Sequence, residues 1–195
     1  MYCAKLTGLL LLIVMLGGSL GACNDLTNDL VPSGSDKRGD VAIGTTGSRP
    51  GQIAADFSIT DSLDNTFTLA DHLSGGSQPA DAIVLYFTMW CPICLSHTDH
   101  MLTTIIPQFN ARGTVVYGLV DYVSGSVIMS RATELANGYG GSAFTTLVDI
   151  HQGLMDQFNA AMGTVVVIAG DGTILLNEDY RNGSALQDTL DRQLP

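Results

Sequence analysis

The sequence predicts an α/β domain with a central mixed β-sheet flanked by helices on both faces. A continuous apolar, partly β-branched run over residues 82–87 is typical of a central strand buried on both faces. Strand-like and helix-like segments alternate after this run, as they do around a parallel sheet. Near the end of the chain, Asp171-Gly172 has the turn chemistry of an antiparallel hairpin, which makes the predicted sheet mixed.

The other elements follow in order from the same patterns. The strand 82–87 is followed by a helix from Cys91 to about Asn110, with Pro92 as its first residue. The next predicted elements are a parallel strand over 114–121 and helices over 126–137 and 150–161. The hairpin strands are 164–169 and 173–177, and a last helix over 184–193 is predicted to be capped by Ser184.

Length and charge limit the classes of function. A chain of 195 residues has room for one domain, an export signal and a tether. The net charge of -11 comes from 19 acidic and 8 basic residues, and no basic run is longer than Lys37-Arg38. A nucleic-acid partner requires a basic face, so we expect none, and we interpret the acidic surface as an aid to solubility.

The N-terminus predicts export and a lipid anchor. Lys5 precedes an apolar run over 6–16, which is shorter than the ~20 residues of a membrane-spanning helix. Leu20-Gly21-Ala22-Cys23 resembles a bacterial lipobox, which implies cleavage before Cys23 and attachment of lipid to its thiol. A transmembrane helix, or a soluble protein cleaved before Cys23, are the alternatives.

These features divide the chain into three parts. Residues 1–22 are predicted to be a lipoprotein signal peptide, and residues 23–50, rich in Gly, Ser, Thr, Asp and Pro, a flexible tether from lipidated Cys23. Residues 51–195 form the predicted domain. The protein is therefore expected to be exported and anchored by lipid to the extracytoplasmic face of a bacterial membrane.

Two cysteines belong to the predicted domain, because Cys3 lies in the signal peptide and Cys23 carries the lipid. Cys91 and Cys94 form one C-x-x-C motif. Such a pair is a redox couple, part of a metal site or an inert disulfide. A disulfide that closes so short a loop contributes little to stability, which favours the redox couple.

The position of the motif predicts a different role for each thiol. Free N–H groups at the start of a helix stabilise a thiolate, so Cys91 is the predicted nucleophile. Cys94 lies one turn deeper and can attack a mixed disulfide formed at Cys91, which makes it the resolving thiol. Pro92 and Ile93 add no cation, and we therefore expect a moderately reducing couple.

The segments 55–59, 67–73, 84–94, 145–149 and 164–174 together resemble the thioredoxin superfamily, and most closely its membrane-anchored TlpA/ResA-type (redoxin) reductases. The likeness covers about residues 51–195. It implies a thioredoxin-like fold and thiol-disulfide oxidoreductase activity without a dissociable cofactor. It also implies two kinds of partner, exported client proteins with thiols or disulfides and a membrane or periplasmic electron donor.

The chain departs from the family pattern at two places. Gly163 stands where the family has a cis-proline facing the active pair, and a cis bond before a residue other than proline costs ~2.5 to 4 kcal/mol, so we expect a trans peptide. The family role of pairing with substrate would fall on Met162 and Gly163. Leu85 replaces the buried aspartate of thioredoxin, and His97 replaces a glutamate common in TlpA-like proteins.

The roles of His97 and Trp90 and the alternative functions stay open at this stage. His97 either tunes Cys94 and carries its proton or is an ordinary helix histidine, and Trp90 is either a lid over the pair or a core aromatic. A metallochaperone could bind Cu(I) or Zn through the two cysteines and His97, and a binding module could carry a vestigial disulfide. A peroxiredoxin-like peroxidase is a further alternative, because Thr88 resembles a peroxiredoxin residue, but Val84 replaces the proline of that family.

Overall fold

The computed structural model describes residues 41–195. The predicted signal peptide, the lipidation of Cys23 and most of the tether therefore lie outside the described residues. Within residues 41–195, none of the helices combines the length and the apolar character needed to cross a membrane.

The core of the domain is a five-stranded mixed sheet in the order β5-β4-β3-β6-β7. The central strand β3 (Ala82–Thr88) pairs in parallel with β4 (Val115–Asp121), which pairs in parallel with β5 (Phe144–Val148). On its other side β3 pairs antiparallel with β6 (Thr164–Ala169), and β6 pairs antiparallel with β7 (Ile174–Asp179). The predicted mixed sheet and its hairpin are confirmed.

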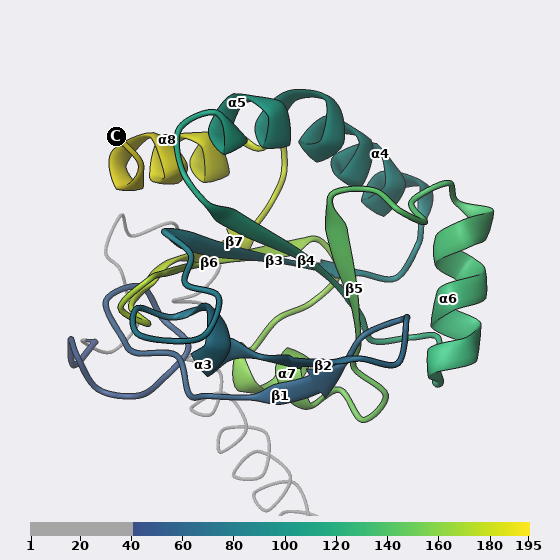
Figure 1. Ribbon diagram of the computed structural model, residues 1–195, viewed down its shortest axis with the longest axis horizontal. Helices are drawn as coiled ribbons and strands as arrows, with labels where there is room; N and C mark the ends of the chain where they lie inside the picture. Colours follow the sequence, from purple (N-terminus) through teal and green to yellow (C-terminus); the bar gives the residue numbers. More distant parts are fainter. Residues whose placement is uncertain (1–40) are drawn as a thin grey trace, which may run out of the picture. The chain divides into compact units, whose positions relative to one another are not determined.

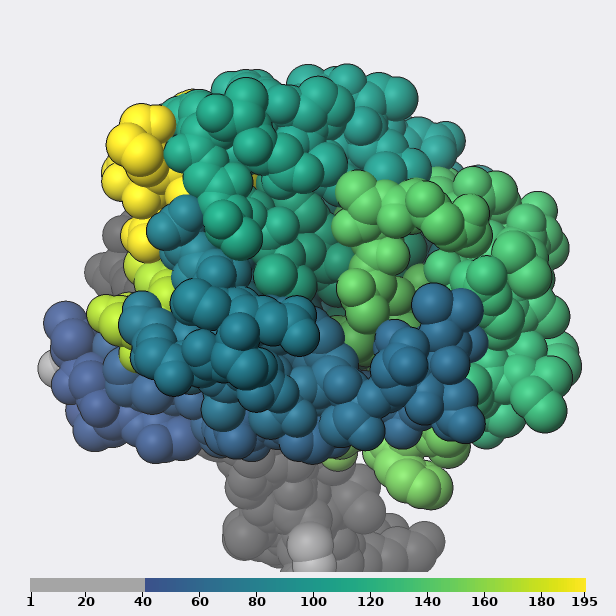
Figure 2. All heavy atoms as spheres, in the orientation of Figure 1, coloured from purple at the N-terminus to yellow at the C-terminus, as the bar shows by residue number. Residues whose placement is uncertain are grey.

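Layers cover both faces of this sheet (Figure 1). One face carries the helices α4 (Pro92–His100), α5 (Ile106–Asn110) and α8 (Ser184–Gln193). The other face carries the short helices α3 (Leu69–His72) and α7 (Gly153–Gln157) and a small hairpin of β1 (Ser58–Thr60) and β2 (Thr66–Thr68). Helix α6 (Val127–Ala136) lies beside β5, and Figure 2 shows it forming one side of the molecular surface.

Strand β3 is buried on both faces because its side chains alternate between two apolar clusters. Val84 and Tyr86 pack with α4, α5 and α8, whereas Leu85 and Phe87 pack with α3 and α7. Full burial of each large apolar side chain contributes about 1.5 to 3 kcal/mol. The alternation also decides that Tyr86 faces α4 and that Leu85 faces away from it.

The predicted helix from Cys91 to about Asn110 is continuous but not uniform. Between α4 and α5, the residues Met101–Ile105 form a wider π-helical turn. Pro107 follows this turn, and a proline has no N–H to donate and its ring clashes with the carbonyl four residues earlier. The wider turn accommodates Pro107 without ending the helix.

Two sequence predictions about helices were wrong in detail. The helix predicted over 150–161 is only the short α7, since Asn159 just beyond it has a left-handed φ of 47°. Ser184 is the first residue of α8 and does not cap it. Gly183 occupies the N-cap position, and the Asn182 side chain accepts hydrogen bonds from the Ser184 backbone and hydroxyl at 3.1 and 2.8 Å.

The folded domain begins before the predicted boundary at residue 51. The N–H of Gly51 donates to the carbonyl of Ile174 on β7 at 2.8 Å, and Gly44 donates back to Gly51 at 2.8 Å. The Asn177 side chain on β7 donates to the carbonyl of Ser48 at 2.7 Å. The end of the predicted tether is thus held against the hairpin of β6 and β7.

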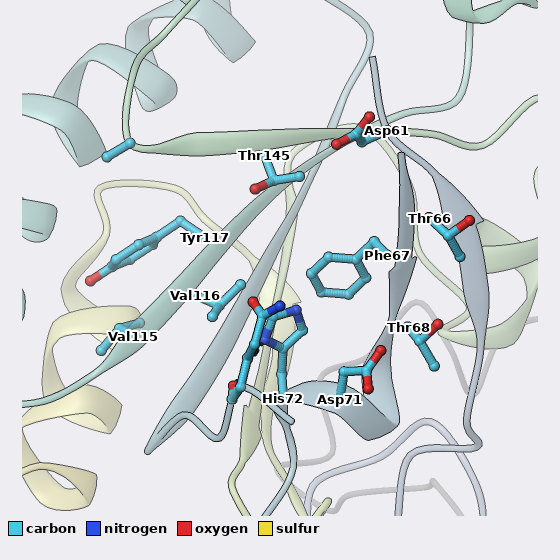
Figure 3. A pocket seen from close by; sticks show the side chains of 12 residues that line it. Asp61, Thr66, Phe67, Thr68, Asp71, His72, Val115, Val116, Tyr117 and Thr145 are labelled. Atoms are coloured by element: carbon cyan, nitrogen blue, oxygen red, sulfur yellow. Dashed lines mark hydrogen bonds between the residues drawn. The ribbon is translucent and has the colours of Figure 1, made fainter. Parts of the chain in front are cut away.

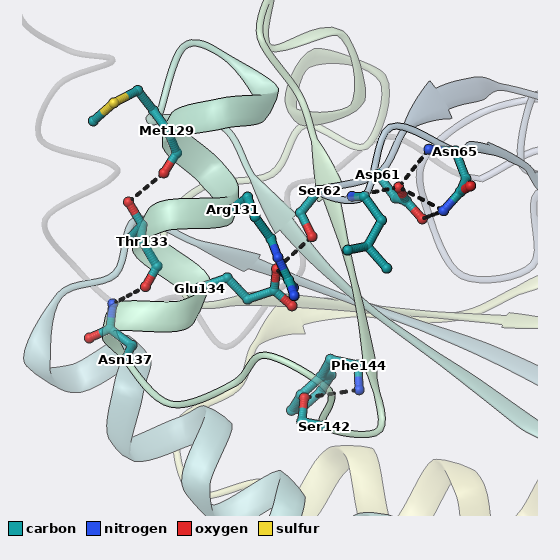
Figure 4. Close-up of polar contacts among 11 residues, drawn as sticks. Asp61, Ser62, Asn65, Met129, Arg131, Thr133, Glu134, Asn137, Ser142 and Phe144 are labelled. Carbon is teal, nitrogen blue, oxygen red and sulfur yellow. Dashed lines mark hydrogen bonds and ion pairs between the residues drawn. The ribbon is translucent and has the colours of Figure 1, made fainter.

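A buried carboxylate holds α6 against the turn that joins β1 and β2 (Figure 4). The Glu134 side chain is only 4% exposed and forms an ion pair with Arg131 at 2.8 Å. The hydroxyl of Ser62 donates a hydrogen bond to the same carboxylate oxygen. Both partners are needed because a buried charge without partners is strongly destabilising.

This pair leads to a stability prediction. Arg131→Ala should lower the free energy of unfolding by about 2 kcal/mol, because it leaves the Glu134 charge buried with one partner fewer. Urea unfolding of the full chain measures the change. Arg181→Ala is the matched control, since its ion pair with Asp179 is 4.0 Å long and exposed and should contribute less than about 0.5 kcal/mol. Equal losses in the two variants would contradict the prediction.

Candidate active site

Cys91 and Cys94 lie at the junction between the carboxyl end of β3 and the start of α4. Cys91 is the N-cap residue of α4 and Pro92 follows as its first helical residue, as predicted. The N–H of Cys94 donates to Cys91 Sγ at 3.3 Å, and the two sulfurs are 2.9 Å apart as free thiols. Cys91 is partly exposed and Cys94 is fully buried.

The surroundings of Cys91 favour its thiolate. Partial desolvation raises the pKa of Cys91, but the hydrogen bond with the Cys94 thiol and those with the backbone of Cys94 and Ile93 outweigh it, so that the pKa is lowered overall. Helix N-terminal N–H groups stabilise a thiolate in this way. The exposed sulfur is therefore the more nucleophilic one, and the buried sulfur lies directly behind it.

Trp90 holds a strained backbone conformation just before the pair. Its φ is 60°, which is uncommon for a bulky residue, and its N–H donates to Thr88 Oγ1 at 3.0 Å. The indole is partly buried against the core of the α4 face and stacks on Tyr139 with ring centroids 6.2 Å apart. Thr88 itself is fully buried, so its hydroxyl serves this turn and is not presented to solvent beside Cys91.

Met162 and Gly163 lie opposite the pair, as the resemblance implied. Met162 Sδ is 3.5 Å from Cys91 Sγ. Gly163 has a φ of 84°, and no cis peptide bond occurs among residues 41–195, so the predicted trans peptide is confirmed. The Gly163 N–H donates to the carbonyl of Phe87 at 3.0 Å, and its carbonyl accepts from the N–H of Tyr180 at 2.8 Å. Both backbone groups of Gly163 are thus used within the domain.

His97 is part of a partly buried polar pair and not an isolated surface side chain. Its Nδ1 is 2.9 Å from the hydroxyl of Tyr86, which is fully buried on β3. Burial lowers the pKa of His97, while the charge of Asp179 opposes this effect. Tyr86 was not predicted, because the buried aspartate of thioredoxin corresponds to Leu85, and Leu85 faces away from α4. Side chains alternate between the two faces of β3, and this alternation places the Tyr86 hydroxyl on the face that packs against α4. That pattern could have identified Tyr86 from the sequence.

His100 belongs to a second, neighbouring pair. Its Nδ1 is 2.7 Å from the hydroxyl of Tyr180, a buried residue that follows β7. Among residues 41–195, no three side chains of His, Cys, Asp or Glu gather in an arrangement suited to a metal ion. The two histidines of α4, His97 and His100, are each hydrogen-bonded to a tyrosine.

The exposed rim around Cys91 is apolar. Met89, Ile93 and Met162 are all large hydrophobic residues with exposed surface. An open polar pocket of about 370 Å³ lies elsewhere, lined among others by Phe67, His72 and Val115 (Figure 3). Val115 begins β4, which runs parallel to β3, so this pocket lies at the opposite end of the sheet from the cysteines.

The comparisons with known proteins are informative at the level of structure. No family model and no curated protein matches the sequence. A candidate protein disulfide isomerase from Bacteroides thetaiotaomicron superposes with a TM-score of 0.60 at 18% identity, covering 74% of this chain and 87% of that one. A candidate thiol:disulfide interchange protein DsbE from Chlorobium tepidum has a TM-score of 0.60 at 16% identity, covering 74% and 97%.

A candidate thioredoxin from Neisseria meningitidis superposes with a TM-score of 0.56 at 21% identity, covering 71% of this chain and 89% of that one. The chain thus has a thioredoxin-like fold, and the predicted fold is confirmed. Its structural neighbours include thioredoxin-like proteins described as disulfide exchange proteins.

The lowered pKa of Cys91 predicts the pH dependence of its alkylation. In the reduced full chain, Cys91 should react with iodoacetamide with a midpoint below the value of about 8.5 found for an unperturbed cysteine. Reactivity rises as the pH rises through this pKa, because the thiolate is the reacting form. Mass spectrometry of the Cys91 peptide measures the rate, and the same protein in denaturant is the control. A midpoint in the folded protein at or above that of the denatured control would contradict the prediction.

Gly163→Pro, which restores the residue typical of the family, should destabilise this protein. Proline cannot adopt a φ of 84° and has no N–H for the bond to Phe87, so we expect a loss of about 3 kcal/mol or more. Gly163→Ala keeps the N–H and should lose about 1 to 2 kcal/mol, since its Cβ would lie 3.1 Å from Asp179 Oδ1 in a left-handed backbone. Urea unfolding measures both, and a proline variant as stable as the alanine variant would show the account to be wrong.

Proposed function

We propose that the protein is a thiol-disulfide oxidoreductase that reduces or exchanges disulfides of exported proteins through Cys91 and Cys94. The observation that carries this proposal is the contrast between the two sulfurs. Cys91 is partly exposed and hydrogen-bonded at a helix N-terminus, and Cys94 is buried 2.9 Å behind it. The thioredoxin-like neighbours support the same class of chemistry.

The proposed reaction needs no dissociable cofactor. The Cys91 thiolate attacks one sulfur of the client disulfide, whose other sulfur leaves as a thiolate and is protonated by water. Cys94, after losing its proton, then attacks Cys91 Sγ in the mixed disulfide. The bond between Cys91 and the client breaks, and the second client thiol is released. The client is reduced by two electrons and the pair is oxidised to a disulfide, which an electron donor must reduce again.

The client is proposed to dock on the apolar rim of the site. Met162 contacts the Cys91 sulfur, and the exposed Met89 and Ile93 lie two residues from Cys91 on either side of it in the chain. Methionines suit the recognition of many partners because their side chains are flexible and polarisable. Gly163 uses its own backbone groups within the domain, so contacts of the client with these three side chains carry the binding. An extended client segment with apolar residues beside its disulfide fits this rim.

The cellular setting is proposed from the N-terminal sequence. A signal peptide over 1–22 and a lipid on Cys23 would attach the domain to a bacterial membrane, on its extracytoplasmic side. There the domain would meet exported client proteins and a membrane or periplasmic electron donor. These features lie outside the described residues.

Trapping with a variant of the resolving cysteine tests the proposed function. The Cys94→Ser form of the full chain should accumulate mixed disulfides with client proteins, because Cys91 can still attack but nothing expels the client. Non-reducing electrophoresis followed by mass spectrometry identifies them. The double variant Cys91→Ser/Cys94→Ser is the matched control, as it keeps every other cysteine. No mixed disulfides beyond this control, together with stoichiometric metal in the purified protein, would favour a metallochaperone instead.

A further inference from the structure

Tyr86 and His97 form a polar pair that has no part in the proposed attack by Cys91 and Cys94. Tyr86 has no exposed surface and packs in the same core cluster as Cys94, on the face of β3 that α4 covers. Its hydroxyl is 2.9 Å from His97 Nδ1, and the two rings meet edge to face with centroids 5.9 Å apart. His97 itself is partly exposed. The pair thus extends from the buried thiol to the surface.

Cys94 needs such a connection because it must exchange a proton while buried. A thiolate attacks disulfides and a thiol does not, so Cys94 has to lose its proton before it can resolve the mixed disulfide. The residue has no exposed surface, and its thiol therefore cannot hand the proton directly to bulk water.

We propose that Tyr86 and His97 form the route by which Cys94 gives up and regains its proton. This inference rests on the proposed function, since it describes the resolving step of that reaction. The Tyr86 hydroxyl interacts with the Cys94 thiol within the same core cluster, so we assign Tyr86 as a catalytic residue in this step. His97 acts through Tyr86 and is a positioning and proton-accepting residue.

The protonation states of the two residues suit a relay. Burial, followed by the charge of Cys94 and its hydrogen bond with the hydroxyl, strongly raises the pKa of Tyr86, so the phenol stays neutral and can accept and donate at once. Burial lowers the pKa of His97, so its imidazole is neutral at neutral pH. His97 Nδ1 is the ring nitrogen that faces the Tyr86 hydroxyl, and in the proposed relay it is the proton acceptor.

Cys94 passes its proton to the Tyr86 oxygen while the Tyr86 hydroxyl proton moves to His97 Nδ1. The Cys94 thiolate then supplies the electron pair of the new Cys91–Cys94 bond, and the leaving client sulfur takes the pair of the broken bond. The His97 imidazolium releases its proton to water or to the leaving thiolate. The groups that interact with the relay from the surrounding elements are Cys91, Cys94, His100, Asp179, Tyr180 and Arg181.

The chain contains a matched control pair. His100 and Tyr180 are also a histidine on α4 and a buried tyrosine, joined at 2.7 Å. Replacement of these residues removes a hydrogen bond of the same kind close to the site. His100→Gln and Tyr180→Phe therefore report the structural effect of losing such a bond, while leaving the bond between Tyr86 and His97 in place.

A reaction with two phases separates the two thiols. The reduced full chain is mixed with excess dithiobis(nitrobenzoate), whose released thiolate absorbs visible light. Attack by Cys91 releases the first thiolate at a rate that rises with probe concentration, and attack by Cys94 releases the second at a rate independent of it. Cys94→Ser should show the first phase alone, and Cys91→Ser/Cys94→Ser provides the blank for other thiols.

Tyr86→Phe and His97→Gln should each slow the second phase by about 100-fold, a typical effect of losing general acid-base catalysis. The controls His100→Gln and Tyr180→Phe alter neighbours of the relay but not the proposed route of the proton, so they should slow the second phase far less. In the wild type, the second-phase rate should rise with pH to a plateau with a midpoint below about 6.5, because neutral His97 accepts the proton. In His97→Gln this plateau should vanish, and the rate should continue to rise toward the pKa of an ordinary thiol, about 8.5.

Three results would overturn the relay. A normal first phase with an unchanged second phase in Tyr86→Phe and His97→Gln would refute the relay while leaving the proposed function intact. Equal slowing in these variants and in the His100 and Tyr180 controls, with an unaltered pH profile, would assign the pair a purely structural role. Absence of the first phase in the wild type would instead contradict the proposed function, and the relay with it.

Discussion

The site depends on the hydrogen bond from the N–H of Cys94 to Cys91 Sγ at the start of α4. This bond exists because β3 delivers the chain directly into a helix whose first N–H groups have no partner within the helix. Cys91 occupies the N-cap, where a serine or aspartate oxygen usually accepts such a bond, and its sulfur takes that place. The same geometry lowers the pKa of Cys91 and directs Cys94 into the core behind it.

Two residues beside this junction have a positive φ. Trp90 has a positive φ and is held by Thr88, and Gly163 has a positive φ and is held between Phe87 and Tyr180. Strained residues persist only where the surrounding structure holds them, and they are concentrated at functional sites. Here they bring Met162 beside Cys91 from a different strand end. Gly163 thus supports the site through its flexible φ and its N–H, two properties that proline does not have.

The two sulfurs have opposite environments, and this contrast organises the proposed chemistry. Cys91 is surrounded by an exposed apolar rim that suits a protein client, whereas Cys94 lies in a core where its polar neighbour is Tyr86. A protein that exchanges disulfides needs one thiol that meets the client and one that is shielded until the mixed disulfide forms. The pairing of Tyr86 with His97 connects the shielded thiol to the surface without exposing it.

Local patterns in the sequence determined much of this protein. The apolar run over 82–87, the C-x-x-C motif with Pro92, the hairpin at Asp171-Gly172 and the alternation of elements predicted the sheet, the junction and the roles of Cys91 and Cys94. These features act over a few residues, so their physical causes are present in the chain itself. Errors arose where ends of elements depend on neighbours, as at α7 and at Ser184.

Only the tertiary structure decided which distant residues surround the cysteines. It placed Met162 against Cys91, used both backbone groups of Gly163 and paired Tyr86 with His97. The sequence contained His97 as a candidate, but its partner depends on which face of β3 packs against α4. That choice follows from the burial of both clusters at once, since a shift of one residue would exchange every side chain between the two faces. The sequence alone therefore determined the C-x-x-C pair at the start of a helix, and the packing of the sheet against α4 determined what surrounds it.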